Sequence, residues 1–485
     1  MPKICVKWSG QKYDVDVNTD LEPLVLKSQL FELTGVIPDR QKVMIKGKIL
    51  KDESWGDIKL KEGELIMMMG SSDALPQRIN MDQSDGAAGQ MDGEEEKVVL
   101  PAGLKNLGNS CYMNASLQCY KAIPELSDAL KIYSAPPNEA DARGNMLTTS
   151  VKKLFEDMDR AQLKNPDQQV SVPFLMLTVL HNVFPQFATR NERGEFQQQD
   201  ANECFAETLR MISEQTRLKS AGSPTETQTV RTSRLFETEF EVTLKNLENP
   251  DEPVDATRES TMQLSCFLSQ EVKYVQLGIK SKLTEEIEKH SASLGRNAKY
   301  QKQSLVRRLP AYLSIQMVRF FYKEKDQINA KILKDVKFPI NLDLQDICTP
   351  ELKTKIQPMR DLFKAYDEKV QEELKQAKMD VDSGKSLPKK AEPTDFEPYS
   401  FQDDPGSNNS GLYELKGVIT HKGRASNSGH YVAWVRVKGD KWAMCDDDEV
   451  HPVSEEDVLK LSGGGDWHCA YVLLYGPRAL PKQSA

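Results

Sequence analysis

One segment, residues 103–114 (GLKNLGNSCYMN), constrains the fold of this 485-residue chain more than any other. A turn rich in glycine and asparagine leads into Cys111, and residues 115–120 have the composition of a helix. A helix N-terminus stabilises a thiolate through its dipole and its unpaired N–H groups, and the thiolate is the form that attacks carbonyl carbons. Asn106 precedes Cys111 across the turn, where its amide could donate to an oxyanion beside the sulfur.

A cysteine alone also fits a second interpretation, a buried structural thiol, because free cysteine is among the most buried residue types. We expect that structural role for five other cysteines: Cys119, Cys204, Cys266, Cys348 and Cys469. Cys111 differs from them because a matching base is found near the other end of the chain.

That base is His430, which follows a loop of small residues and begins an alternating apolar run typical of a strand. We expect a hairpin with strands at residues 431–437 and 441–445. A hairpin returns the chain alongside itself, so Asp446 would lie beside His430. Singly, His430 could be an ordinary histidine and residues 446–448 a solvated acidic turn. Together with Cys111 they match the nucleophile, base and orienter of a thiol enzyme.

The Cys111 and His430 segments resemble those of the ubiquitin-specific proteases, papain-like deubiquitinases with a thumb–palm–fingers fold. Three further stretches resemble family motifs in the same order: residues 198–204 (QQDANEC), the segments 309–320 and 338–339, and residues 470–475 (AYVLLY). The resemblance covers residues 99–478. It implies a cysteine protease that hydrolyses the isopeptide bond at the C-terminal glycine of ubiquitin.

The resemblance also implies a role for each site residue. Cys111 is the nucleophile, His430 the general base and acid, Asp446 the orienter and Asn106 an oxyanion donor. Asp447 is a second candidate orienter that the resemblance does not rank against Asp446. The residues expected to bind the ubiquitin tail are Asp200, Gln199, Phe321, Ser428, Gly429, Tyr431 and Tyr471. Asp200 also suits the N-cap of a helix at residues 201–211.

Two loops, at residues 320–331 and 424–429, correspond to family loops that cover the tail channel of the free enzyme. We therefore expect the free chain to be weakly active and a partner to shift the loops toward an open state.

The N-terminal segment has the element order of a β-grasp. Residues 3–8 and 12–17 alternate as a hairpin, residues 23–33 have the pattern of an amphipathic helix, and short strands follow at 42–45, 48–50 and 64–69. The segment resembles ubiquitin but lacks the terminal Arg-Gly-Gly, which favours a fixed docking domain over a conjugated modifier. We expect Met44 and Met68 to form an exposed apolar docking patch. The alternative is that these methionines fill the small core.

A ubiquitin-like domain joined to this protease domain resembles the proteasome-associated branch of the family. It implies docking of residues 1–70 on the regulatory particle of the 26S proteasome and trimming of ubiquitin from substrates held there. One competing hypothesis is a non-catalytic ubiquitin-binding regulator of the proteasome. Another is a generic papain-like peptidase or transglutaminase.

Composition sets further limits. The net charge of −9 gives no basic field to attract nucleic acid. No signal peptide and no apolar run of about eighteen residues is found. Eight scattered cysteines fit a reducing compartment, so we expect a cytoplasmic monomer that is also found in the nucleus. No Cys-x-x-Cys pair occurs, so we expect fingers without zinc, and no metal or cofactor.

The predicted fold class is α+β, with a β-grasp domain at residues 1–70, a flexible linker at 71–98 and the catalytic domain at 99–478. Within the catalytic domain we expect residues 350–400 to form a charged, partly disordered insertion. It comprises a helical stretch at 362–374 and disorder over 375–397.

Overall fold

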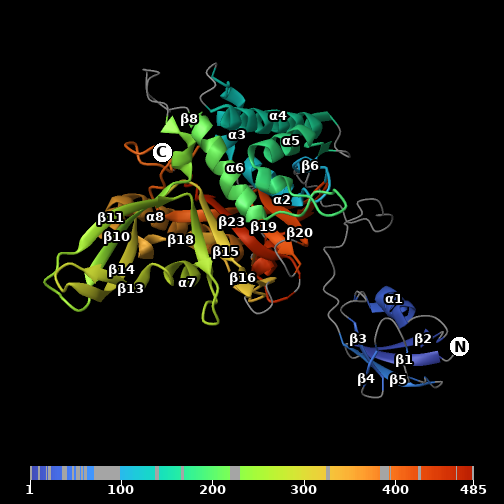
Figure 1. Cartoon of the computed structure of the whole chain (residues 1–485). Helices are drawn as coiled ribbons and strands as arrows, with labels where there is room; N and C mark the ends of the chain where they lie inside the picture. The colour runs from blue at the N-terminus through green and yellow to red at the C-terminus, as the bar shows by residue number, and fades with distance from the viewer. Residues whose placement is uncertain are drawn as a thin grey trace. The chain divides into compact units, whose positions relative to one another are not determined.

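A computed structural model shows the chain as two compact units, residues 1–94 and residues 95–485, which we describe separately (Figure 1). The residues whose structure is described are 3–8, 11–17, 19, 23–34, 36, 41–45, 48–50, 55, 58, 60, 63–69, 99–136, 141–164, 169–218, 230–323, 328–382, 393, 395–423, 428–465 and 467–482. The expected linker, residues 71–98, lies outside the described residues. No helix in the described ranges is long and apolar enough to cross a membrane.

The N-terminal unit is a five-stranded sheet with one helix packed on it. The strand order is β2-β1-β5-β3-β4, and β1 and β5 run parallel while the other pairs are antiparallel. The bounds are β1 Lys3–Trp8, β2 Gln11–Asp16, α1 Pro23–Thr34, β3 Lys42–Ile45, β4 Lys48–Ile49 and β5 Leu65–Met69. Alternate strand residues and Leu26 and Leu30 of α1 enclose one small core.

The predicted exposure of Met68 is wrong. Side chains alternate along β5, so Met68 points into the core and is 4% exposed, whereas Leu65, Met67 and Met69 are 55%, 54% and 51% exposed. Met44 is partly exposed and lies opposite Met67 on β3. The exposed apolar row of this sheet therefore consists of Leu65, Met67 and Met69 with Met44 beside it.

The palm of the catalytic unit is an eight-stranded sheet in the order β12-β15-β23-β19-β20-β21-β22, with β18 paired to β19. Its strands are β12 Gln263–Phe267, β15 Leu313–Val318, β18 Asn341–Asp343, β19 Leu412–Lys422, β20 His430–Lys438, β21 Lys441–Asp446, β22 Glu449–Val453 and β23 Cys469–Pro477. Every residue of β23 is buried, as expected for a central strand covered on both faces.

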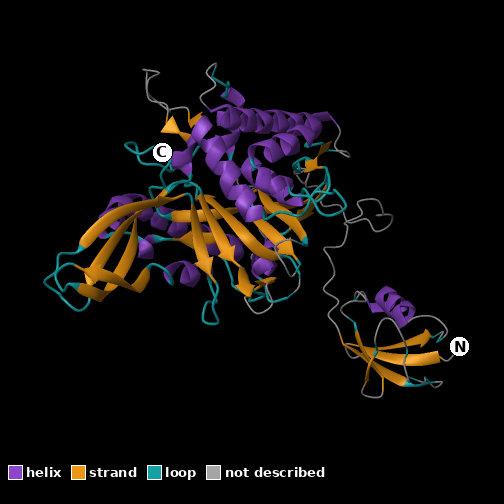
Figure 2. Cartoon of the chain, in the orientation of Figure 1, coloured by secondary structure: helices purple, strands orange, loops and turns teal. Residues whose placement is uncertain are grey.

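The thumb is a helical layer gathered along one side of the palm sheet (Figure 2). Its helices are α2 Cys111–Lys121, α3 Pro124–Ile132, α4 Ala142–Lys164, α5 Phe174–Val183 and α6 Ala201–Gln215. Residues 111–120 of α2 are all buried, because α2 packs against β20 of the palm and against α6 and α3 of the thumb. Short strand pairs, β6 Gly103–Leu104 with β7 Val170–Ser171 and β8 Arg217–Leu218 with β9 Val230–Arg231, border this layer.

The fingers are a separate antiparallel sheet in the order β11-β10-β14-β13. Their strands are β10 Thr238–Asn246, β11 Asp255–Thr261, β13 Thr284–Ser291 and β14 Arg296–Arg308. At their tip, Glu252 accepts hydrogen bonds from Ser291 Oγ (2.6 Å), Ser293 Oγ (2.5 Å) and Asn246 Nδ2 (2.8 Å). The serine hydrogen bonds, followed by that of Tyr300, lower the pKa of Glu252 to about 2. Hydrogen bonds to the Glu252 carboxylate thus join the turn between β10 and β11 to the turn between β13 and β14.

The remaining α-helices and strands of the described residues are α7 Val275–Lys280, β16 Phe320–Lys323, β17 Ile328–Lys331, α8 Pro350–Asp382 and α9 Glu455–Leu459. Helix α8 corrects the predicted disorder for residues 375–382, which continue the helix, while 383–392 lie outside the described residues. Residues 375–382 contain Lys, Gln, Ala and Met, which favour a helix, so their high charge was a poor indicator of disorder.

One buried cation, Arg319, connects several backbone segments of the palm through hydrogen bonds. Arg319, which follows β15, is 0% exposed and donates to the carbonyl oxygens of Ala470 (2.7 Å), Ser462 (2.7 Å) and Lys334 (2.8 Å). It also donates to Ile332 O at 3.1 Å. Burial lowers the pKa of Arg319, and the acceptors around it compensate for the lost hydration.

We predict that Arg319→Lys lowers the free energy of unfolding by about 3 kcal/mol or more, because one ammonium cannot reach four carbonyls that a planar guanidinium satisfies. Denaturant unfolding followed by tryptophan fluorescence would measure it. Arg307→Lys is the matched control, since the Arg307 side chain is 30% exposed and about 0.5 kcal/mol or less is expected. Equal losses in the two variants would contradict the prediction.

Candidate active site

The turn before α2 is built by a side chain. The Oδ1 atom of Asn106 accepts hydrogen bonds from the backbone N–H of Gly108 (2.9 Å) and of Ser110 (3.3 Å). Gly108 and Asn109 both have positive φ, 98° and 53°, conformations that glycine and asparagine tolerate best. The helix then begins at Cys111, which is 1% exposed. The thiol thus sits at a helix N-terminus, where a thiolate is stabilised.

The expected hairpin is present, with β20 beginning at His430 and β21 ending at Asp446. His430 Nε2 lies 2.5 Å from Asp446 Oδ1. Hydrogen bonds to Asp446 and then to Cys111 raise the pKa of His430 to about 10. Burial alone would raise the pKa of Asp446, but the hydrogen bond and charge of His430 outweigh it and lower that pKa. The structure thus brings together the three residues expected to form a triad.

Asp447 has another set of partners. Its φ is 54°, and its carboxylate accepts hydrogen bonds from Asn106 Nδ2 and Asn114 Nδ2, both at 2.8 Å. Its Oδ2 lies 4.0 Å from His430 Nε2, too far for a hydrogen bond. Asp447 therefore fixes the amide of Asn106 rather than the imidazole, and it leaves one amide N–H of Asn106 for another acceptor.

His430, Asp446 and Asp447 also offer ligand atoms within 4.8 Å of one another, close enough for a metal ion. Both oxygens of Asp447 already accept amide hydrogens, however, and the Nε2 atom of His430 is bonded to Asp446. The ligand atoms of these three side chains are therefore already engaged in hydrogen bonds.

Sequence reasoning missed Gln198. Its Nε2 lies 3.4 Å from Cys111 Sγ, and the residue is 9% exposed. The neighbouring Gln199, selected from the sequence, donates instead to Thr189 Oγ1 at 2.6 Å. Two adjacent glutamines cannot be ranked by type. Both glutamines lie shortly before α6, which packs on the helix that carries the thiol, so their position indicated the pair without selecting Gln198.

Asp200 connects α6 to the palm. Its Oδ1 accepts hydrogen bonds from the N–H groups of Asn202 (2.8 Å) and Glu203 (3.1 Å), the expected N-cap, while its Oδ2 accepts one from Tyr471 Oη at 2.6 Å. The ring centroids of Tyr471 and Tyr431 are 6.1 Å apart, and both residues are buried. The hydrogen bond and the ring contact join Asp200, Tyr471 and Tyr431 in one wall of contacting side chains.

The segment before His430 is held by close backbone contacts. His421 Nε2 donates to Ser428 O at 3.1 Å, and both Ser428 and Gly429 are exposed. Gly429 has φ 120°, and a Cβ there would lie 2.2 Å from Lys422 O, so only glycine fits. The side chain of Phe321 and residues 324–327 and 424–427 lie outside the described residues, so the two expected loops are only partly described.

The comparisons with known proteins agree with this geometry. Residues 102–475 match the family model "Ubiquitin carboxyl-terminal hydrolase", and residues 4–73 match the model "Ubiquitin family". Ubiquitin carboxyl-terminal hydrolase 14 of Caenorhabditis elegans is 42% identical over 99% of this chain and 94% of its own length. Ubiquitin carboxyl-terminal hydrolase 6 of Arabidopsis thaliana is 38% identical over 99% of both chains.

A solved structure of similar fold is the SAGA Ubp8/Sgf11/Sus1/Sgf73 DUB module bound to ubiquitin aldehyde. The TM-score is 0.52 at 19% sequence identity, over 81% of this chain and 72% of that chain. The expected α+β fold, a ubiquitin-like domain followed by a papain-like protease domain, is confirmed. The chain belongs to the ubiquitin carboxyl-terminal hydrolase family and is a thiol-dependent ubiquitin hydrolase with an N-terminal ubiquitin-like domain.

Proposed function

We propose that this enzyme docks on the 26S proteasome through residues 1–70 and trims ubiquitin from proteasome-bound substrates, and that it is weakly active when free. The observation that carries the catalytic part is Cys111 at the start of α2, facing the His430–Asp446 pair. The docking part is supported by a ubiquitin-like domain without a conjugation terminus. The proposed enzyme is a monomer of the cytoplasm and nucleus and acts without a metal or cofactor.

In the proposed reaction, His430 takes the proton of Cys111, and the thiolate attacks the carbonyl carbon of the last ubiquitin glycine. A C–S bond forms and the carbonyl electron pair moves to oxygen. The free N–H of the Asn106 amide and the backbone N–H of Cys111 receive that oxyanion, and one such donor typically contributes ~3 kcal/mol to barrier lowering. His430 then protonates the leaving lysine amine as the C–N bond breaks. Water hydrolyses the remaining thioester.

In this proposal two effects place the ubiquitin tail: a carboxylate attracts its basic residues, and the narrowness of the channel excludes large side chains. Asp200, held by Tyr471, offers a carboxylate to a basic tail, and Tyr431 extends the same wall. Ser428 and Gly429 border the approach to His430. A narrow channel bordered by these residues would admit glycine and reject larger side chains. Phe321 and Gln199 remain proposed tail contacts from the resemblance alone.

We predict that Asp446→Asn lowers the hydrolysis rate of a fluorogenic ubiquitin C-terminal amide by ~10³-fold or more, because the imidazole loses its orienting anion. The imidazolium is present below the His430 pKa of about 10 and is lost as pH rises through it. Removing the carboxylate lowers that pKa toward ~6.5, so the alkaline limb of the pH–rate profile should move to lower pH. Asp448→Asn, an exposed neighbour, is the control. An unmoved alkaline limb in Asp446→Asn would contradict the assignment.

We predict that Met67→Asp weakens binding of the full chain to purified 26S proteasome by about tenfold or more, because it places a charge in the exposed row Leu65, Met67 and Met69. Fluorescence anisotropy of the labelled chain would measure the affinity. Leu33→Asp is a matched control, since Leu33 is 48% exposed on α1. Equal weakening by both variants would indicate lost folding rather than a lost contact, and wild-type affinity in Met67→Asp would exclude this row as the docking surface.

We predict that adding deubiquitinase-depleted 26S proteasome raises the rate at which the chain hydrolyses the ubiquitin amide, and that Cys111→Ala abolishes hydrolysis in both conditions. The expected rise follows from a shift toward open loops. High activity of the free chain, unchanged by proteasome, would overturn the regulatory part. No turnover in either condition would favour the alternative, a non-catalytic ubiquitin-binding regulator.

A further inference from the structure

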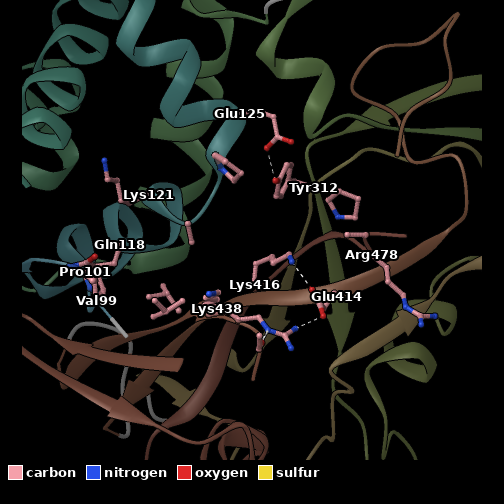
Figure 3. Close-up of a pocket in the computed structure, with 18 of the residues that line it drawn as sticks. Val99, Pro101, Gln118, Lys121, Glu125, Tyr312, Glu414, Lys416, Lys438 and Arg478 are labelled. Atoms are coloured by element: carbon pink, nitrogen blue, oxygen red, sulfur yellow. Dashed lines mark hydrogen bonds and ion pairs between the residues drawn. The ribbon is translucent and has the colours of Figure 1, made fainter. Parts of the chain in front are cut away.

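A cavity of about 730 Å³ lies between thumb and palm at the end of α2 remote from Cys111 (Figure 3). Its walls come from α2 with the start of α3, from the far end of β20, and from the segments 396–399 and 477–479. Its volume falls within the ~300–1,000 Å³ typical of small-ligand pockets. No residue of the proposed catalytic group lines it.

Glu125, in the first turn of α3, supplies a carboxylate to this cavity. Its two oxygens accept hydrogen bonds from Tyr312 Oη (2.6 Å) and Tyr399 Oη (2.8 Å), and the first of these is drawn in Figure 3. Burial, and then the negative charge of Glu125, raise the pKa of both tyrosines, so the phenols keep their protons and donate. Within the described residues, Glu125 is hydrogen bonded by phenols but paired with no cation.

Most basic groups around the cavity are already neutralised. The ion pairs are Lys121 with Asp159 (2.7 Å), Lys416 with Glu414 (2.6 Å), Arg436 with Glu414 (2.6 Å) and with Glu455 (3.4 Å), and Arg478 with Asp367 (3.0 Å). Glu397 lines the same cavity and, like Glu125, has no ion pair in the described ranges. Lys438 lines the cavity as well, so five basic side chains stand against six carboxylates, and Glu125 and Glu397 are the two carboxylates without an ion pair in the described ranges.

A second, independent observation comes from Gln118. This side chain lines the cavity, is 2% exposed, and donates from Nε2 to Ala102 O at 2.8 Å, while its Oε1 has no hydrogen-bond partner. A buried acceptor without a donor is costly, and because Oε1 itself is almost fully covered, an N–H group in the cavity would satisfy it once the Gln118 amide turns toward the ligand. The rings of Tyr312, Tyr399 and Phe396 line the cavity as well, and aromatic faces attract cations.

We propose that this cavity is a second binding site, for an alkylammonium or alkylguanidinium group on an apolar stem. Glu125 and Glu397 supply the countercharge, Gln118 an acceptor, and the aromatic rings the apolar walls. The same chemistry occurs in a free aliphatic amine and in the lysine or arginine side chain of a peptide.

Occupancy of this site is coupled to hydrolysis through the two elements it shares with the catalytic group. Helix α2 carries Cys111 at one end and Gln118 about 10 Å along its axis. Strand β20 carries His430 at one end and Lys438 at the other. A ligand wedged between their far ends alters how α2 packs on β20, and hence the approach of thiol and imidazole.

Binding is tested on the full chain by NMR of ¹³C-methyl methionine, with Met158, which lines the cavity, assigned through Met158→Leu. n-Butylguanidinium should shift the Met158 signal saturably, while butyrate and 1-pentanol should not. n-Butylamine and acetyl-lysine amide, which share an ammonium group, separate the two sources: tighter binding of the amine indicates a free metabolite, and tighter binding of the amide a peptide side chain. Equal shifts with 1-pentanol and butylguanidinium would overturn a cation site.

Glu125→Gln removes the charge and should weaken butylguanidinium binding at least tenfold, whereas Glu351→Gln, an exposed change on α8, should not. Tyr399→Phe removes one phenol from Glu125 and should retain binding, which keeps the test valid if Glu125→Gln fails to fold. Full affinity in folded Glu125→Gln, or loss of binding in Tyr399→Phe, would overturn the assignment. Saturating butylguanidinium should change kcat for the ubiquitin amide, and an unchanged kcat would overturn the coupling.

Discussion

The packing of α2 against β20 is the constraint on which the site depends. Residues 111–120 of α2 are buried in an unbroken run, so this helix has no solvent face. Its polar side chains must therefore find partners inside the protein. Ser116 bonds back to Tyr112 O at 2.8 Å, and Tyr120 Oη donates to Phe205 O at 2.5 Å. The packing of this helix therefore sets the position of its first residue, the thiol, relative to the strand that begins with His430.

Asp447 links this helix to the hairpin beyond the imidazole. Its left-handed backbone conformation costs of order 1 kcal/mol, and three hydrogen bonds hold the residue in that conformation. Two come from Asn106 and Asn114, and the third joins Leu104 N to Asp447 O at 2.7 Å. The adjacent aspartates thus divide two tasks. Asp446 is bonded to the imidazole of His430, and Asp447 holds the amide of Asn106.

Features carried by local pattern could be predicted from the sequence. The turn at Cys111, the hairpin from His430 to Asp446 and the N-cap at Asp200 each depend on neighbouring residues. The partner of Asp447 could not be predicted in this way, because Asn114 lies 333 residues away in the chain. The prediction of which β5 side chains are exposed failed for another reason. Residues 65–69 are all apolar, so no polar residue indicated which alternate side chains face the core.

Two glycines show how closely the backbone segments of the site approach. A Cβ on Gly103 of β6 would lie 2.5 Å from Asp448 O, and one on Gly429 would lie 2.2 Å from Lys422 O. Neither obstacle is a flexible side chain, so any larger residue would have to displace a strand or turn. Displacement at Gly103 would separate Leu104 from Asp447 and release the carboxylate that holds Asn106. The amide of Asn106 is therefore positioned by main-chain contact between thumb and palm. Cys111 and His430 come from opposite ends of the catalytic domain, and their arrangement depends on that contact.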